Sequence, residues 1–506
     1  MINDENDYEI KAPAAGAMIE SLRAYGYSPA AAIADIIDNS ISAGARTIWI
    51  YFYWAARDSY ISILDDGPGM DESTLSAAMR PGSCNPLEER SPKDLGRFGM
   101  GLKTASFSQC KNLTVKSKTK NGVISLRRWD INHVIDTNEW QLLKNAKPDS
   151  EHILACLDSL KTGTLVLWDD LDKLMGETCD VNSHDEQQRF LKIIDEVKAY
   201  LEMVFHNFLS GLNPSIKIEV NGNKLFPWDP FCEIHPATIA FPEEKILHPH
   251  GDTIIKGFVL PHKDKLTSEA FEANAGPGGW NARQGIYIYR NKRLLVAGGW
   301  LGLGDNKPWM QEEQYKLSRI RIDISNTQDF DWLIDVKKSS AKPPAWIKHR
   351  LIMLSDKVRT RAREVFAHRG TYGSRPRVLN ISRIWLPVNK EGRMSYRLDR
   401  HHHLIQALDS ILLTKANREI FSALLRSLEE TLPISSIWLN TAENSDNHSM
   451  PFETESEMGK RRLVEISYEI LRQQKGLSAD ASRKKLLEME SFQDETFQDI
   501  IYTLNN

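Results

Sequence analysis

Three polar residues whose side chains could do chemistry lie close together in the segment SPAAAIADIIDNSISAGA, namely Asp35, Asp38 and Asn39. Ser28 is a typical first residue of a helix and Gly44 a typical end, so this segment is predicted to be helical. At 100° per residue, the two carboxylates and the carboxamide share one face, opposite an isoleucine face. An ordinary solvated face is the alternative, but the small residues around the three would leave room for a ligand.

A second candidate site follows the apolar strand ISIL, where the chain reads Asp65-Asp66-Gly67-Pro68-Gly69. Asp65 at the strand end can accept a hydrogen bond from an exocyclic amine, and Gly67 and Gly69 let the backbone approach a flat ring. The same D-x-G-x-G pattern also occurs in tight turns and some calcium loops. The spacing of carboxylates in an EF-hand is missing here.

The third candidate is a glycine-rich stretch that runs into helix-forming residues. It contains Gly96, Arg97, Phe98, Gly99, Met100, Gly101, Leu102 and Lys103. Glycines ahead of a helix expose backbone N–H groups, which can bind phosphate. The stretch is neither a Walker A loop nor a dinucleotide-binding G-x-G-x-x-G motif, so another kind of phosphate site is implied. Farther along, Lys161-Thr162-Gly163-Thr164 opens an apolar strand.

Alternating helix and strand patterns surround these motifs and predict one α/β domain. The strands are expected at 47–54, 60–64, 113–118, 123–130 and 164–168, and helices are expected after Gly69 and Gly101. The segment 79–97 is rich in Pro, Gly, Ser and charge, and we expect it to form a lid-like loop.

Two further units are expected beyond this domain. The second begins with the amphipathic run 187–209 and continues as strands at 215–220, 253–260, 285–290 and 319–325, with a hairpin turn at Asn221-Gly222. The third is mostly helical, with candidates at 346–366, 404–430 and 460–475 and a linker at 441–457. The expected boundaries are 1–185, 186–345 and 346–506.

The four motifs, in this order, resemble the Bergerat-type ATP site of the GHKL superfamily, which includes gyrase B subunits, heat-shock chaperones, sensor kinases and MutL. The resemblance implies an α+β fold: a Bergerat-type sandwich, an S5-like transducer domain and a helical C-terminal region. It implies ATP and Mg²⁺ as cofactors. Asp35 would then polarise the attacking water, Asn39 would hold magnesium, and Asp65 with Gly67 and Gly69 would bind adenine. The glycine-rich stretch would wrap the phosphates, and Thr164 would support the adenine side.

One residue departs from the family pattern. The family's general base is most often glutamate, whereas this chain has Asp35 at that spacing. The missing methylene moves the carboxylate back by roughly 1.5 Å, and misplacement of that order can cost about a hundredfold in rate. Slow hydrolysis is therefore expected, with Asp38 as an alternative base.

The second unit resembles the transducer domain of MutL and MORC ATPases, on the segments QGIYIYRNKRLLVAGGW and DWLIDVKKSSAKPP. In that domain a lysine contacts the γ-phosphate. Lys337 is the first candidate for this role and Lys338 the second, although both could be lysines of a basic linker. The I-D-N-S, G-R-F-G-M-G-L-K and Y-R-N-K-R segments are most similar to the MORC branch and its bacterial relatives. That similarity implies an ATP-dependent homodimer, with a nuclease or methyltransferase partner in restriction-modification or anti-phage defence.

A basic segment follows the predicted transducer. Residues 337–377 contain twelve Lys or Arg and two acids, in a chain whose net charge is −4. We expect duplex DNA to bind here, and a solvated basic face or a surface for an acidic partner is the alternative. The run His401-His402-His403 does not predict a metal site, because consecutive residues point in different directions.

Composition limits the remaining possibilities. The 506 residues are 41% hydrophobic and 26% charged, as in a soluble globular chain. The five cysteines form no C-x-x-C pair, and no secretion signal or membrane span is recognisable, so a cytoplasmic protein is expected. We therefore expect an ATP-hydrolysing clamp. A nucleotide-gated scaffold with little hydrolysis and a protein-remodelling chaperone are the alternatives.

Overall fold

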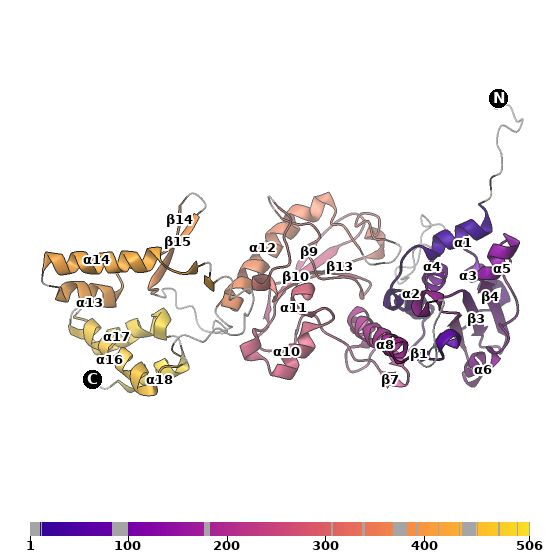
Figure 1. Ribbon diagram of the computed structural model, residues 1–506, viewed down its shortest axis with the longest axis horizontal. Helices are drawn as coiled ribbons and strands as arrows, with labels where there is room; N and C mark the ends of the chain where they lie inside the picture. The colour runs from indigo at the N-terminus through magenta and orange to yellow at the C-terminus, as the bar shows by residue number, and fades with distance from the viewer. Residues whose placement is uncertain are drawn as a thin grey trace, which may run out of the picture. The chain divides into compact units, whose positions relative to one another are not determined.

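The computed structural model describes residues 11, 13–82, 100–176, 183–304, 307–335, 338, 340–367, 382–390, 393–412, 414–434, 436–437, 452, 454–473, 476–492 and 494–504. It divides into two compact units, Met1–Gly373 and Ser374–Asn506 (Figure 1). The candidate site residues all belong to the first unit.

A seven-stranded sheet forms the base of the first unit, in the order β4-β3-β5-β2-β1-β6-β7. Its strands are β1 (Thr47–Tyr53), β2 (Tyr60–Asp65), β3 (Asn112–Lys118), β4 (Ile124–Asp130), β5 (Gly163–Asp169), β6 (Lys217–Val220) and β7 (Asn223–Lys224). The first five confirm the strands predicted for the α/β domain, with ends that differ by one residue at most. Strand β2 ends at Asp65, which lies opposite Thr164 of β5.

Helices cover both faces of this sheet. One face packs against α1 (Ala15–Arg23), α2 (Pro29–Ala43), α4 (Gly101–Phe107) and α8 (His184–Val204), and the other against α6 (Glu151–Leu154) and a 3-10 turn at Ala155–Ser159. The side chains of β5 alternate accordingly: Val166 and Trp168 join the first core, and Leu165 and Leu167 the second. Shorter helices are α3 (Glu72–Met79), α5 (Ile131–Thr137), α7 (Asp172–Met175) and α9 (His206–Leu209).

The local signals of the site helix act as predicted. The Ser28 hydroxyl accepts a hydrogen bond from the Ala31 amide at 3.2 Å, and Pro29 opens α2. Gly44 ends the helix in the left-handed conformation, at φ 89°. The helix that carries Asp35, Asp38 and Asn39 is therefore fixed at both ends.

A second sheet completes the first unit, with strands in the order β12-β11-β13-β10-β8 and β9 paired to β10. The bounds are β8 (Ile239–Ala240), β9 (Glu244–Ile246), β10 (Thr253–Val259), β11 (Gly285–Arg290), β12 (Arg293–Ala297) and β13 (Ser318–Ile324). The helices α10 (Ser268–Ala275), α11 (Gly279–Arg283) and α12 (Ala345–Ala367) accompany it, and Figure 1 shows α12 alongside β10 and β13.

Strand β11 has both faces buried. Ile286 and Ile288 belong to the core of the second sheet, whereas Tyr287 and Tyr289 belong to the same core as the helices of the first sheet. The two sheets are thus joined by continuous packing rather than by a linker.

This packing differs from the expected domain division. Strand β6, expected in the second unit, pairs in parallel with β1 and extends the first sheet. Helix α12, expected to open the C-terminal region, buries Ile347 and Leu351 in the core of the second sheet. Both differences have one cause, since hydrophobic periodicity identifies an element but not the sheet that it joins.

The second unit is small and mostly helical. It contains the hairpin β14 (Trp385–Lys390) and β15 (Arg393–Leu398) and the helices α13 (His403–Ile411), α14 (Lys415–Glu430), α16 (Glu457–Gln473), α17 (Ala479–Leu487) and α18 (Glu495–Thr503). The predicted helix at 404–430 is therefore two helices, and most of the predicted linker at 441–457 lies outside the described residues. The predicted fold class, α/β sheets followed by a helical region, is confirmed.

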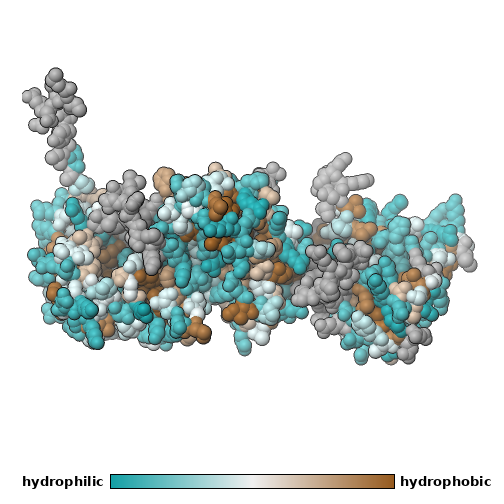
Figure 2. Space-filling view, turned by 180° about the vertical axis from the view of Figure 1, so that it is seen from behind, coloured by the Kyte–Doolittle hydropathy of each residue, from teal (hydrophilic) through white to brown (hydrophobic). Residues whose placement is uncertain are grey.

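The surface agrees with the composition. Figure 2 shows a face that is mostly hydrophilic, with apolar side chains in small separate groups. Within the described part of the chain, no helix combines the length and the apolar character needed to cross a bilayer.

Candidate active site

The two carboxylates of α2 are buried and do not form a solvated face. The exposed fraction is 2% for Asp35 and 0% for Asp38, whereas Asn39 is exposed. Burying a carboxylate without a partner is costly, so both acids require compensating charge or hydrogen bonds.

A lysine from the second sheet's side of the unit supplies part of that charge. The Lys338 amine lies 3.2 Å from Asp35 Oδ1 and 2.8 Å from Asp38 Oδ2. Lys338 adopts a left-handed backbone conformation, φ 52°, and its amide donates to the Asp335 carbonyl at 3.1 Å. Lys337, the first candidate for a phosphate-sensing lysine, lies outside the described residues. The structure therefore brings the second candidate to the acids.

A second cation reaches Asp38 from β12. Arg293 Nε donates to Asp38 Oδ1 at 2.9 Å, and the guanidinium carbon lies 4.8 Å from the centre of the Phe205 ring. Both members of this ion pair are almost completely buried. Asp38 thus has two cationic partners, while Asp35 has Lys338 and the hydroxyl of Tyr27, which donates to Oδ2 at 2.9 Å.

These partners separate the acidities of the two carboxyls. Burial raises the pKa of Asp35, and the Lys338 ammonium offsets this only in part. Burial would also raise the pKa of Asp38, but Arg293 and Lys338 together outweigh it and lower that pKa. Asp38 is therefore the more acidic carboxyl of the two, and Asp35 is the better proton acceptor.

The carboxylate of Asp65 lies at the end of β2 among neutral donors. The Ser40 hydroxyl donates to its Oδ2 at 2.7 Å, and the Gly67 amide donates to its Oδ1 at 2.9 Å. Burial raises the pKa of Asp65, while these hydrogen bonds and one from the Thr164 backbone oppose the rise. A buried acceptor of this kind is suited to a neutral N–H donor such as an exocyclic amine.

The glycines after Asp65 are required by close contacts. A Cβ at Gly67 would lie 2.8 Å from Asp65 Oδ1, and one at Gly69 would lie 2.0 Å from the Lys118 carbonyl oxygen. Gly69 also has a left-handed φ of 72°. Substitution at either glycine would move the Asp65 loop.

Thr164 belongs to a hydrogen-bond chain beside this loop. Its hydroxyl lies 2.9 Å from Ser117 Oγ, which accepts a hydrogen bond from the Met70 amide at 2.8 Å. The chain joins β5, β3 and the segment after Gly69, so Thr164 supports the loop through Ser117.

Only part of the glycine-rich stretch can be placed. Gly96, Arg97, Phe98 and Gly99 lie outside the described residues. Gly101 begins α4, and a Cβ there would lie 3.5 Å from Asp35 Oδ2. The partly buried side chains of Met100 and Leu102 pack against the core. The amine of the buried Lys103 donates to the Ala78 carbonyl at 2.8 Å. Lys103 thus binds the end of α3.

The described residues fit a magnesium–nucleotide complex. Asp65 provides an acceptor beside a glycine cradle, as an adenine amine requires. Asn39 presents an exposed carboxamide one turn beyond Asp35, and amide oxygens are ordinary magnesium ligands. Lys338 supplies a cation that a terminal phosphate could attract.

Three contributors to the site were not predicted from the sequence. Tyr27, Ser40 and Arg293 hold Asp35, Asp65 and Asp38, respectively. Ser40 could have been found, because it follows Asn39 on the same helix. Arg293 had a weaker signal, namely a cation at the start of an otherwise apolar strand.

Comparison with known proteins agrees with this geometry. Residues 27–164 match the family of histidine kinase-, DNA gyrase B- and HSP90-like ATPases. The chain is also 30% identical over 130 residues to ATPase morc-1 of Caenorhabditis elegans, a match that covers 25% of this chain and 15% of that protein. Residues 27–164 include Asp35, Asn39, Asp65 and Thr164. The chain therefore carries a GHKL-type ATPase domain, and part of the chain is similar to a MORC ATPase.

Proposed function

We propose that the protein is an ATP-hydrolysing switch in which Lys338 links the nucleotide's terminal phosphate to the second sheet. The observation that carries the proposal is the contact of the Lys338 amine with both acids of α2. A γ-phosphate would compete with these acids for the amine, so that nucleotide binding would change the position of the Lys338 loop.

In this proposal Asp35 is the general base. It accepts a proton from a water whose oxygen bonds to the γ-phosphorus, while the bond from that phosphorus to the bridging oxygen breaks and ADP leaves. Asn39 would hold magnesium, which neutralises phosphate charge when it is bound. Asp38 stays ionised beside Arg293 and keeps Lys338 near the site. Asp65 binds the adenine amine.

The proposal includes DNA binding through residues 337–377, but only by some of the basic side chains. Others already have partners within the protein. Arg350 pairs with Glu244 at 2.7 Å, and the guanidinium of the buried Arg359 lies 3.8 Å from the centre of the Tyr315 ring. Four other described cations of the segment are exposed: Lys342, Lys348, Lys357 and Arg363. Lys348 and Lys357 point about 180° apart on α12, so these cations form no single stripe.

Dimerisation and a role in defence complete the proposal. GHKL ATPases commonly dimerise, and an ATP-dependent homodimer would let the switch close and reopen as a clamp. A nuclease or methyltransferase partner would perform any cutting or modification of DNA. The resemblance to MORC-like ATPases supports these steps.

Steady-state ATP turnover with magnesium tests the proposal, measured with and without duplex DNA at low and moderate salt. Turnover that DNA increases and that Asp65→Asn abolishes is the expected result. The salt dependence matters because phosphate contacts release counterions. Nucleotide binding without turnover under every condition would contradict hydrolysis, and turnover indifferent to DNA would contradict the DNA clamp.

A nucleotide-gated scaffold with little hydrolysis is a second candidate, favoured by one contact. Asp35 shares the Lys338 ammonium with Asp38, which reduces its tendency to take up a proton. Single-turnover kinetics separate the two candidates: a scaffold binds ATP tightly and retains it uncleaved.

A further inference from the structure

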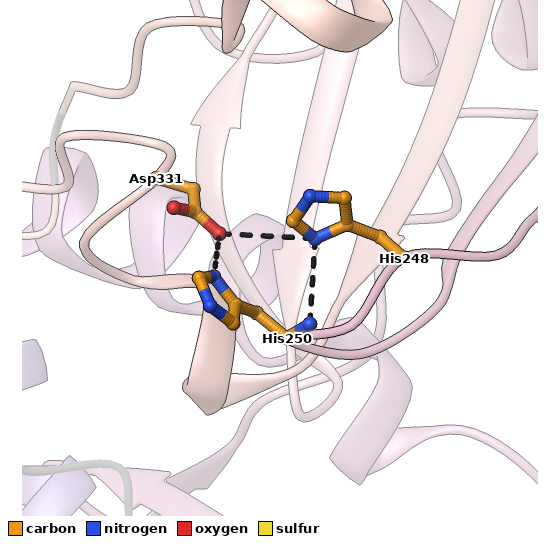
Figure 3. A group of neighbouring side chains, drawn as sticks. All are labelled: His248, His250 and Asp331. Carbon is orange, nitrogen blue, oxygen red and sulfur yellow. Dashed lines mark hydrogen bonds and ion pairs between the residues drawn. The ribbon is translucent and has the colours of Figure 1, made fainter.

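Two histidines and an aspartate converge at the edge of the second sheet, away from the acids of α2. His248 and His250 flank Pro249 in the turn between β9 and β10, and Asp331 lies after β13, in the segment that leads toward Lys338. Figure 3 shows the three side chains pointing toward one another. Among the residues that the structure describes, one potential ligand atom from each lies within 4.8 Å of the others.

The distances suit a single ion. His250 Nδ1 lies 2.8 Å from Asp331 Oδ2, and His248 Nδ1 lies 4.0 Å from the same oxygen. Bonds of about 2.0–2.2 Å from a metal place its ligands roughly 3–4 Å apart. The His250 side chain is 61% exposed, so it has room to move the short distance that coordination requires.

A gap separates His248 from the carboxylate. His248 Nδ1 and Asp331 Oδ2 face each other across 4.0 Å, which is too far for a direct hydrogen bond. The backbone N–H of His250 donates to His248 Nδ1 over 3.4 Å, a long contact that coordination by this nitrogen would replace. A cation placed between the nitrogen and the oxygen would contact both.

The surroundings hold these groups in position. The His248 ring stacks on the Trp346 indole, with centroids 4.2 Å apart and planes within 5°. The turn is fastened to the segment before Asp331, since the Thr327 hydroxyl donates to the His250 carbonyl and the Gln328 amide donates to the Gly251 carbonyl. Such supporting contacts reduce the ordering cost of metal binding.

We propose that His248, His250 and Asp331 form a binding site for a divalent transition metal, with Zn²⁺ as the preferred ion. Two imidazole nitrogens and one carboxylate oxygen are ligands for zinc rather than for magnesium or calcium. The exposure of His250 leaves the remaining position open to water. A bound ion would fasten the β9–β10 turn to the segment that continues into the Lys338 loop.

Zinc titration of the full-length protein by calorimetry tests the site, with ⁶⁵Zn equilibrium dialysis for stoichiometry. We expect one ion per chain with a dissociation constant in the micromolar range or below. Zinc should also raise the melting temperature by a few degrees, because it binds only the folded site. Co²⁺ bound in place of zinc should give visible absorption bands typical of a cobalt ion with few ligands, all of them nitrogen or oxygen atoms. None of these readouts depends on ATP turnover.

Two variants and one matched control identify the ligands. His250→Ala and Asp331→Asn should each weaken zinc binding at least tenfold and abolish the thermal shift. His262→Ala removes another histidine, beyond the end of β10, whose Nδ1 lies 3.3 Å from Asp264. Among the residues that the structure describes, His262 belongs to no such three-residue group. It should leave zinc binding unchanged. Millimolar affinity in the parent protein, or equal losses in all three variants, would overturn the site.

Discussion

The two ends of the candidate ATP site are built in opposite ways. Asp65 is held by neutral donors from its own sheet and helix, namely Ser40, Gly67 and Thr164. Asp35 and Asp38 instead depend on cations that come from the second sheet and its loop. In the proposed site, adenine recognition would thus be local, whereas the phosphate end would depend on the position of another part of the molecule.

Removing the buried guanidinium should show the largest effect of this difference. Arg293→Met leaves the fully buried Asp38 with only Lys338, and breaking a buried pair in this way costs about 3–5 kcal/mol of unfolding free energy. Urea denaturation measures the loss. Arg321→Met is the control, because its partner Asp323 is partly exposed, and it should cost about 1 kcal/mol or less. Equal losses would mean that the phosphate end does not depend on the second sheet.

Asp65→Asn should weaken ATP binding at the other end of the site, with a smaller loss of unfolding free energy than Arg293→Met. The variant presents an amide donor where an acceptor is needed, and we expect ATP affinity to fall at least about a hundredfold. Calorimetric titration with ATP measures this. Asp66→Asn is the matched control, since its oxygen can still accept from the Arg46 and Thr47 amides. ATP binding that survives in Asp65→Asn would contradict the assignment of the adenine end.

Lys338→Met should separate binding from turnover. With Asp65 intact, ATP affinity should change less than about tenfold, whereas turnover should fall by about a hundredfold because a charge that stabilises the transition state is lost. Steady-state and single-turnover kinetics distinguish the two effects. Lys342→Met, an exposed lysine four residues later, should leave both unchanged. A purely structural lysine would instead alter stability with normal turnover in the folded fraction.

Tyr27→Phe should give the smallest effect, visible in the pH profile. The Asp35 carboxylate must be deprotonated to act as a base, so turnover falls as the pH drops through its raised pKa. The hydrogen bond from Tyr27 lowers that pKa. Its removal should therefore shift the low-pH side of the curve of turnover against pH to higher pH, by less than about one pH unit. Tyr25→Phe, whose side chain is exposed, should leave the profile in place. A shift to lower pH would contradict the role of Asp35.

The same contrast explains how much could be predicted from the sequence. The adenine end follows from short motifs, because Asp65, Gly67 and Gly69 are neighbours in the chain and Thr164 opens a recognisable strand. The phosphate end could be predicted only in part. Helix periodicity places Asp35 and Asp38 on one face, but Arg293 lies 255 residues from its acid and Lys338 lies 303 residues from Asp35. Pairing over such separations depends on how the sheets pack, which local patterns do not encode.

Strand β11 restricts how the switch can move. Its tyrosines pack in the core of the first sheet and its isoleucines in the core of the second sheet, so the strand is buried between the two cores. Rotating the second sheet away from α2 would expose the tyrosines to water. Lys338 instead meets the acids of α2 through its side-chain amine alone, apart from the packing of β11. We therefore expect the proposed switch to begin with a change in the contacts of Lys338, while the two packed sheets keep their positions.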